Sequence, residues 1–225
     1  MDIPTEAIRA FGPALDDLAE ADPSVTEVSA FGRAKGLERL RSLTGLRRLW
    51  LSGMSERAWS QLQRLETLRE LVVHDSRASS IAVMPDFPML ESLAVSGSAK
   101  LKSLDGLDRY RELRRLILFA CCNYHDLSPV GTLTHLDTLC LEGGFSKMLR
   151  VESLAPLSGL VDLRRLRLAS IHVSDRSLRP LEALGRLESV FIARTFPDEE
   201  FCRLAEALPG ARGEFLDSAR KHEAG

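Results

Sequence analysis

The sequence has little of several features that would define a class of function. Among its 225 residues there is one asparagine, Asn123, and no uncharged apolar run approaches the ~20 residues that span a bilayer. There is no basic excess either, because 30 lysines and arginines stand against 32 acidic residues, for a net charge of −2. Proteins that bind phosphate backbones carry a strong positive excess. We therefore expect neither a membrane nor a nucleic acid as the main partner.

Signals for export and for a disulfide or metal framework are also missing. The first residues, MDIPTE, contain no basic region and no apolar core, so we identify no secretory signal. The four cysteines form no CxxC pair, and they stand at Cys121, Cys122, Cys140 and Cys202. This pattern favours free thiols in a reducing cytoplasm over disulfides or zinc ligation, and it predicts a cytoplasmic location.

The residue in excess is leucine, which accounts for 39 of the 225 residues. Leucines recur at every third position in several runs. This spacing fits neither a long α-helix nor a strand, but it suits 3₁₀ turns, whose side chains eclipse at i and i+3. At the end of each run the spacing drops to two, which indicates a strand. The predicted strands include residues 49–51, 71–73, 93–95, 116–118, 139–141, 166–168 and 190–192.

One repeating unit is therefore a turn, a 3₁₀ segment and a short strand. The leucine three residues before each strand marks the register, and these marks stand at positions 46, 68, 90, 113, 136, 163 and 187. Their separations of 22, 22, 23, 23, 27 and 24 residues indicate seven consecutive units. A degenerate unit is predicted before them at 25–28, and another after them at 211–216.

The LxxLxL pattern at this period resembles the leucine-rich repeat family. The segments LAPL at 154–157 and LRPL at 178–181 resemble its short-repeat branch, which includes phosphatase-regulatory and internalin-like arrays. The resemblance covers residues 25–216. It implies an α/β fold, a right-handed solenoid with a parallel β-sheet on the concave face and 3₁₀ or short helical segments on the convex face. Because the family hosts many unrelated partners, the resemblance implies a fold more than a function.

One departure from the family concerns a loop position. The family normally places an asparagine three residues past the last strand leucine, where its amide bonds the neighbouring loop backbones. This chain has other residues there, namely Met54, Ser76, Ser98, Cys121, Gly144, Ile171 and Thr195. Serine, cysteine and threonine can replace part of that hydrogen bonding, whereas the side chains of Met54, Gly144 and Ile171 cannot. Because buried backbone groups need partners, we expect looser or water-satisfied loops at these three positions.

Both ends of the array are expected to be capped, since an open solenoid end exposes its core. Residues 1–24 are predicted to form an N-terminal helical cap, with apolar residues at helical spacing over 5–20, and the array takes residues 25–196. Residues 197–225 are assigned to a C-terminal cap with a degenerate last repeat and a tail that frays from position 218. Its helix is predicted to start at Pro197 and to present three apolar side chains to the core, Phe201, Leu204 and Leu208.

The 27-residue spacing contains an insertion at 143–150. An insertion in a solenoid maps to a loop at one edge. Phe145 and Met148 in this loop are either a contact element for a partner or side chains that fold back onto the solenoid. The sequence leaves both alternatives open.

Motifs for catalysis, metal binding and nucleotide binding are absent from the sequence. It contains no HExxH or close ligand cluster, no GxxxxGK[ST], no GxGxxG and no GxSxG. We therefore expect no cofactor, no metal site and no enzymatic activity. An enzyme is the weaker alternative, and its candidate residues Cys140, His74 and Glu142 share only the predicted concave face.

The predicted concave face carries the candidate partner-binding residues. The residue between the two inward positions of each strand faces away from the core. We call these residues the central row, and they are Trp50, Val72, Ala94, Ile117, Cys140, Arg167 and Phe191. His74, Phe119 and Glu142 lie beside the row, and Arg115 flanks it on the other side. Exposed apolar residues with aromatics and arginines have the composition of a protein-binding surface, although β-propensity alone also places such residues on strands.

We interpret the chain as a monomeric, non-catalytic scaffold that binds a partner protein through a rigid concave surface. A narrower alternative is an immunity-type or inhibitor-type protein that clamps one enzyme or toxin and also uses the 143–150 loop. A third alternative is an interaction domain whose catalytic counterpart lies on another chain.

Overall fold

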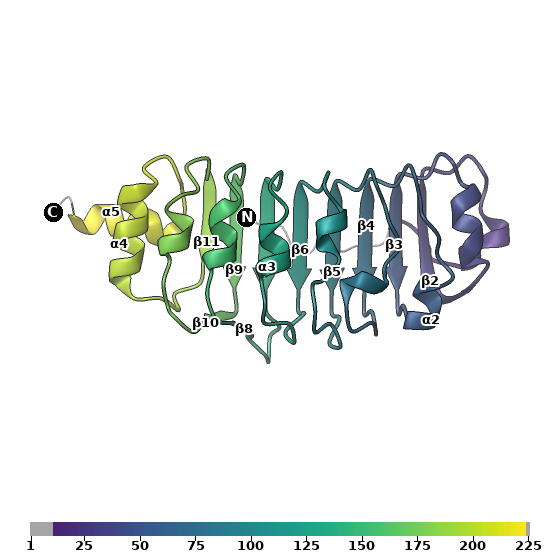
Figure 1. Ribbon diagram of the computed structural model, residues 1–225, viewed down its shortest axis with the longest axis horizontal. Coiled ribbons are helices and arrows are strands. Elements are labelled where there is room, and N and C mark those ends of the chain that lie inside the picture. Colours follow the sequence, from purple (N-terminus) through teal and green to yellow (C-terminus); the bar gives the residue numbers. More distant parts are fainter. Residues whose placement is uncertain (1–10, 224–225) are drawn as a thin grey trace.

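The computed structural model describes residues 11–223 and shows parallel strands stacked along one long axis (Figure 1). Within these residues, nine strands form the main sheet in the order β1-β2-β3-β4-β5-β6-β7-β9-β11, and all pairs are parallel. Two further strands, β8 and β10, form a small second sheet. Each repeat thus adds one strand to the main sheet, which confirms the predicted leucine-rich-repeat solenoid.

The observed strands coincide with the predicted ones in every one of the seven units. Their bounds are β1 (Leu15–Asp17), β2 (Glu27–Lys35), β3 (Arg48–Ser52), β4 (Glu70–His74), β5 (Ser92–Ser96), β6 (Arg115–Phe119), β7 (Thr138–Glu142), β8 (Leu149–Val151), β9 (Arg165–Ala169), β10 (Ile171–Val173) and β11 (Ser189–Ile192). The long β2 lies where a degenerate first unit was predicted.

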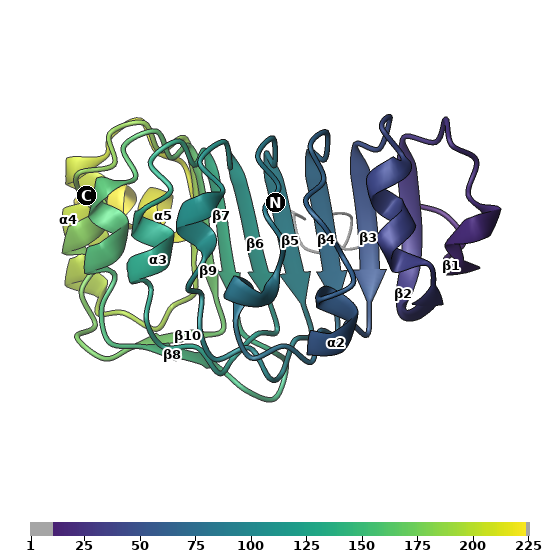
Figure 2. The ribbon, with the colours of Figure 1, turned by 45° about the vertical axis from the view of Figure 1, so that its right-hand side comes forward.

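Short helical segments return the chain from one strand to the next, and they cover one side of the sheet (Figure 2). Most are single 3₁₀ turns, as the three-residue leucine spacing predicts. They are η1 (Leu18–Glu20), η2 (Leu37–Ser42), α2 (Glu56–Trp59), η3 (Ile81–Val83), η4 (Leu107–Arg109), α3 (Ser128–Gly131), η5 (Ala155–Gly159) and η6 (Arg179–Leu181).

The leucines at repeat positions build one continuous core between the sheet and these turns. Leu49, Leu71 and Leu93 are paired across neighbouring strands, and the same position continues through Leu116 and Leu139. All five are completely buried. A single unit cannot shield its leucines, whereas stacked units do, so packing between repeats stabilises the array.

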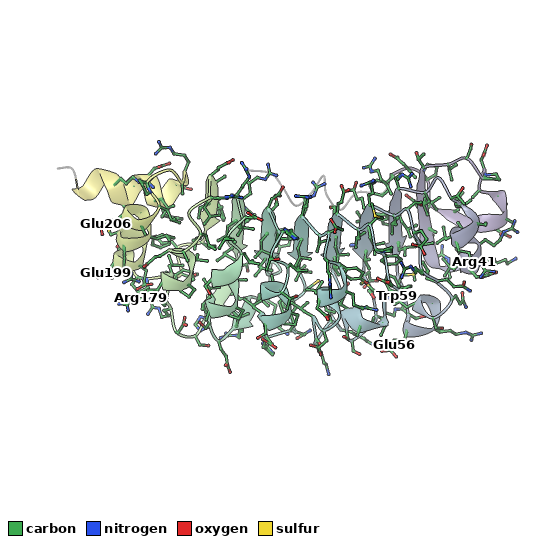
Figure 3. The ribbon with its side chains drawn as sticks, turned by 45° about the horizontal axis from the view of Figure 1, so that its top comes forward. Arg41, Glu56, Trp59, Arg179, Glu199 and Glu206 are labelled. Carbon is green, nitrogen blue, oxygen red and sulfur yellow. The ribbon has the colours of Figure 1, made fainter. Side chains whose placement is uncertain are left out.

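Serine replaces the missing loop asparagine in the first half of the array. Ser76 is buried, and its hydroxyl oxygen accepts hydrogen bonds from the Trp59 ring N–H and from the Ala78 backbone N–H, both at 3.2 Å. The same hydroxyl donates to the Met54 carbonyl at 3.3 Å. Ser98 accepts from the backbone N–H of Ser76 at 3.1 Å. Trp59 belongs to α2 and is labelled in Figure 3.

At the three positions without a bonding side chain, the loops nevertheless find protein partners. The Met54 carbonyl accepts from the Arg77 backbone N–H at 2.8 Å, and Gly144 bonds Lys147 in a tight turn. Ile171 begins β10, which pairs with β8 as the second sheet. The side chains of Met54 and Ile171 are completely buried in the core. The expectation of looser or water-satisfied loops is therefore wrong at these positions, because backbone pairing substitutes for the amide.

The N-terminal end differs from the predicted capping helix. Of the helix expected over 5–20, the part up to residue 10 lies outside the described residues. The rest is not helical over most of its length, because β1 pairs with the edge of β2 and a single 3₁₀ turn, η1, follows. Leu18 from this turn is buried in the main core. The end of the core is thus covered by an added strand and one turn.

The C-terminal end is helical, with α4 (Asp198–Ala207) and α5 (Glu214–Glu223) packed together. Phe201, Leu204 and Leu208 are buried as predicted, whereas Glu199 and Glu206 lie exposed at this end of the molecule (Figure 3). The backbone N–H of Val190 donates to the Arg212 carbonyl, which continues the repeat one step past β11. The predicted frayed tail from position 218 is wrong up to residue 223, because α5 includes it.

Candidate functional site

The central row lies in register across the sheet. Trp50 pairs with Val72, Val72 with Ala94, and the pairing continues through Ile117, Cys140, Arg167 and Phe191. Adjacent strands lie ~4.8 Å apart, so these side chains form one line across the face opposite the leucine core. The predicted register is therefore confirmed for all seven positions.

The middle of this row is buried, which differs from the prediction that the row is exposed. Val72, Ala94, Ile117 and Cys140 are at most 2% exposed, and they form an apolar cluster separate from the main core. Trp50 and Phe119 pack against it, together with Phe11 from the segment before β1. We call these four buried residues the concave cluster. Their side chains are too short to reach past the aromatic rings that pack on them, so they offer no contact area to a partner.

Phe11 is a member of this face that the sequence did not reveal. Its backbone N–H donates to the Ser29 hydroxyl at 3.1 Å, and its ring lies 4.1 Å from the Arg48 guanidinium carbon. The apolar spacing of residues 8, 11, 15 and 18 placed it on a helix at the end of the solenoid. No local pattern indicates that a side chain from this segment packs on the opposite face of the sheet.

The three candidates for catalysis do not form a catalytic arrangement. Burial raises the pKa of the Cys140 thiol to about 12, with a smaller contribution from Glu142, so the thiolate is not available near neutral pH. Glu142 is held by Arg167 at 2.7 Å, and Arg167 lies 4.2 Å from the centre of the Phe191 ring. His74 is exposed and lies 2.9 Å from the Ser96 hydroxyl. Among the described residues, no hydrogen bond joins any two of the three candidates.

Two further searches concern metals and membranes. Within residues 11–223, no group of three histidine, cysteine or acidic side chains is placed to hold a metal ion. In the same part of the chain, no helix has the length and apolar character to cross a bilayer.

The insertion loop projects its aromatic side chain into solvent. Phe145 is fully exposed and Met148 is 36% exposed, whereas Leu149 is buried at the start of β8. Folding back onto the solenoid is thus wrong for Phe145. The backbone of the loop is held in place, because Gly144 donates to the Lys147 carbonyl at 2.8 Å and accepts from the Ser170 hydroxyl at 3.1 Å.

A shallow hollow lies beside this loop at the carboxyl ends of β6 and β7. Its volume is about 240 Å³, and its lining comes from Phe119, Glu142, Gly143, Gly144, Phe145 and Ser170. Gly143 is required here, because a Cβ atom at that position would lie 2.2 Å from the Ser170 carbonyl oxygen. Phe119 pairs with Glu142 across the two strands, so the hollow joins the concave face to the loop.

A larger groove lies at the other edge of the same face, where the strands begin. Its volume is about 470 Å³. We call it the arginine groove, and its lining is Arg47, Arg48, Arg69, Glu70, Glu91, Ser92, Arg114, Arg115, Asp137, Thr138 and Arg165. Arg115, predicted as a contact residue, is exposed here and donates through Nε to the Ser92 hydroxyl at 3.0 Å.

None of the protein-family models and none of the curated proteins matches this sequence. Among solved structures, the chain is similar to an internalin of Listeria monocytogenes, with 17% identity, a TM-score of 0.46, and coverage of 80% of this chain and 65% of that one. For internalin C2 of the same species the values are 17%, 0.45, 72% and 78%. For a leucine-rich-repeat protein of Leptospira interrogans they are 14%, 0.39, 83% and 59%.

The chain thus spans less than two thirds of the length of two of these three proteins. With TM-scores below 0.5 the likenesses carry no argument about function. The assignment of a leucine-rich-repeat solenoid rests instead on the strand register and on the buried leucines of this chain.

Proposed function

We propose that this chain is a non-catalytic interaction scaffold, and that a partner protein docks on the hollow between Phe119 and Phe145 with an apolar side chain of its own. The binding surface comprises the hollow, Met148 on the loop, and the Arg167–Phe191 pair on the neighbouring strands. The concave cluster supports this surface from below and is not itself a contact.

The exposure of Phe145 is the observation that carries this proposal. A fully exposed phenylalanine contributes no buried area to its own fold, while its burial against a partner is worth about 1.5–3 kcal/mol. Aromatic side chains in well-defined hollows dominate the binding energy of protein interfaces. The exposed ring therefore has a reason to be present only if another molecule covers it.

The rigidity of the loop supports the same conclusion. The amide of Gly144 also donates to the Cys122 sulfur at 3.3 Å, in addition to the bonds that fix the turn. A loop that is already ordered loses little conformational entropy when a partner binds. The hollow is thus preformed on a stack of parallel strands.

Affinity capture with surface variants tests the proposal. Wild-type protein and two double variants, F119A/F145A and M89A/V161A, serve as baits in equal amounts. Met89 and Val161 are also large exposed apolar residues, 41% and 54% exposed, and each lies in the connection before a strand, at the opposite edge of the sheet. We expect at least one protein that the wild type and M89A/V161A retain and that F119A/F145A loses. If every retained protein binds the three baits equally, the proposal is wrong.

We further propose that the protein works in the cytoplasm as a monomer. Cys121, Cys122 and Cys140 are buried free thiols, a state that fits a reducing compartment. Cell fractionation tests the location, and light scattering coupled to size-exclusion chromatography tests the monomer. A mass of twice 24.9 kDa would contradict the latter.

A further inference from the structure

The arginine groove has a net positive charge in a protein that is negative as a whole. Its lining contains six arginines and three acidic residues, for a sum of +3. Because the full chain carries −2, the residues outside the groove sum to −5. Positive charge is therefore concentrated at the edge where the strands begin, and such segregation attracts ligands of opposite charge.

Three of the six arginines are already neutralised within the groove or next to it. Arg48 pairs with Glu70 at 2.8 Å, Arg165 pairs with Asp137 at 3.4 Å, and Arg69 pairs with Glu91. These pairs satisfy the carboxylates of the groove. They leave its excess charge on the other three arginines.

The remaining arginines have no carboxylate partner among the described residues. Arg47 donates only to the Thr67 carbonyl at 3.1 Å, and Arg114 makes no side-chain hydrogen bond within residues 11–223. Arg115 bonds the buried Ser92 through Nε, which orients its guanidinium and leaves both Nη groups for a ligand. A guanidinium fork in this state is suited to bidentate binding of a carboxylate.

We propose that the arginine groove binds an acidic, extended segment of the partner protein. The inference rests on the proposed function, because it names the chemistry of that partner. Arg47 adjoins β3, Arg114 and Arg115 lie at the start of β6, and three strand spacings of ~4.8 Å separate these sites by about 14 Å. In an extended peptide, residues i and i+4 are about 13 Å apart on one side. A segment that crosses the strands and carries acidic residues four positions apart therefore matches the two arginine sites.

A labelled peptide tests the inference directly on the full chain. The probe is a fluorescent dodecapeptide of serine and threonine with glutamate at every second position, and its control has glutamine in place of every glutamate. Fluorescence anisotropy compares the wild type with R114Q/R115Q and with R57Q/R150Q. Arg57 and Arg150 are also exposed, but they belong to α2 and β8, which follow the carboxyl ends of β3 and β7. Thermal unfolding by circular dichroism verifies that both variants fold.

We expect the glutamate peptide to bind the wild type, and R114Q/R115Q to weaken binding about tenfold while R57Q/R150Q changes it less than twofold. Binding should also weaken as NaCl is raised, because salt screens exposed charges. Equal binding of the glutamine peptide, or equal affinities for the two variants, would overturn the inference. A single-stranded oligonucleotide that binds the groove more tightly than the peptide would overturn it as well.

The outcome separates this inference from the proposed function. If the peptide does not bind but F119A/F145A still loses its captured protein, the scaffold function stands and the acidic partner segment is wrong. If the captured protein is also indifferent to F119A/F145A, both fail.

Discussion

Replacement of Ser76 by alanine tests how this solenoid holds its loops without the family's asparagine. The hydroxyl accepts from two buried donors, the Trp59 ring N–H and the Ala78 backbone N–H, and it donates to the Met54 carbonyl. Alanine removes all three bonds. The Met54 carbonyl keeps a second partner, the Arg77 backbone N–H, but the two donors lose the hydroxyl that accepts from them.

The size of the effect follows from these bonds. A buried donor left without an acceptor costs about 1–3 kcal/mol, so two of them should lower the free energy of unfolding by at least about 2 kcal/mol. Urea denaturation followed by circular dichroism measures this loss. The matched control is Ser79→Ala, an exposed serine three residues away with one long hydrogen bond of 3.4 Å to Glu56. If the two variants differ by less than about 0.5 kcal/mol, the serine does not replace the asparagine and the reasoning is refuted.

Three other predictions follow from buried or coupled groups. Tyr124→Phe should raise the free energy of unfolding by about 1 kcal/mol in urea titrations, because the buried hydroxyl has no hydrogen-bond partner among the described residues; destabilisation would contradict this. Cys140 should react with iodoacetamide at pH 8 at least ~100-fold more slowly in the folded protein than in urea, as peptide mass spectrometry measures, because it is buried and its pKa is raised to about 12; equal rates would show that the concave cluster is open. Burial raises the pKa of Glu200, but hydrogen bonds from Arg203 and from the Leu178 N–H outweigh it and lower the pKa below its ordinary 4.5, so the stabilisation by Glu200 is present above that pH and is lost as the pH falls through the folded-state pKa. Glu200→Gln should therefore lower the free energy of unfolding by about 1.5 kcal/mol at pH 7 and make little difference well below pH 4, and a gap that does not change with pH would refute the assignment.

The repeat array was predictable because each leucine has one role. The spacing of three followed by two marks which side chains face the core, and a register error of one residue would turn all of them to the other face. That is why the pairing of Trp50 with Val72, and so on to Phe191, agrees with the prediction at every step. The first turns of α4 were predictable for a similar reason, since Pro197 and the acidic residues after it mark a helix start.

The burial of the concave cluster was not predictable from the same pattern. Periodicity says which face Ile117 and Cys140 share, but it does not say which rings lie against them. Phe11 reaches that face through a tertiary contact with Ser29, and the helix-like spacing of its neighbours favoured another location. The pairing of β8 with β10 likewise depends on two loops 22 residues apart, which no local signal joins. The structure thereby moved the candidate contact area from the middle of the row to its edges.

Site-specific photo-crosslinking tests the account most directly. A photoreactive phenylalanine analogue, p-benzoylphenylalanine, replaces Phe145 in one version of the protein and the exposed Val161 in another, and both are irradiated in cells. We predict that position 145 crosslinks to a distinct polypeptide, and that position 161 does not crosslink to it. Identical crosslinks from both positions, or none from position 145, would contradict a docking surface at the insertion loop.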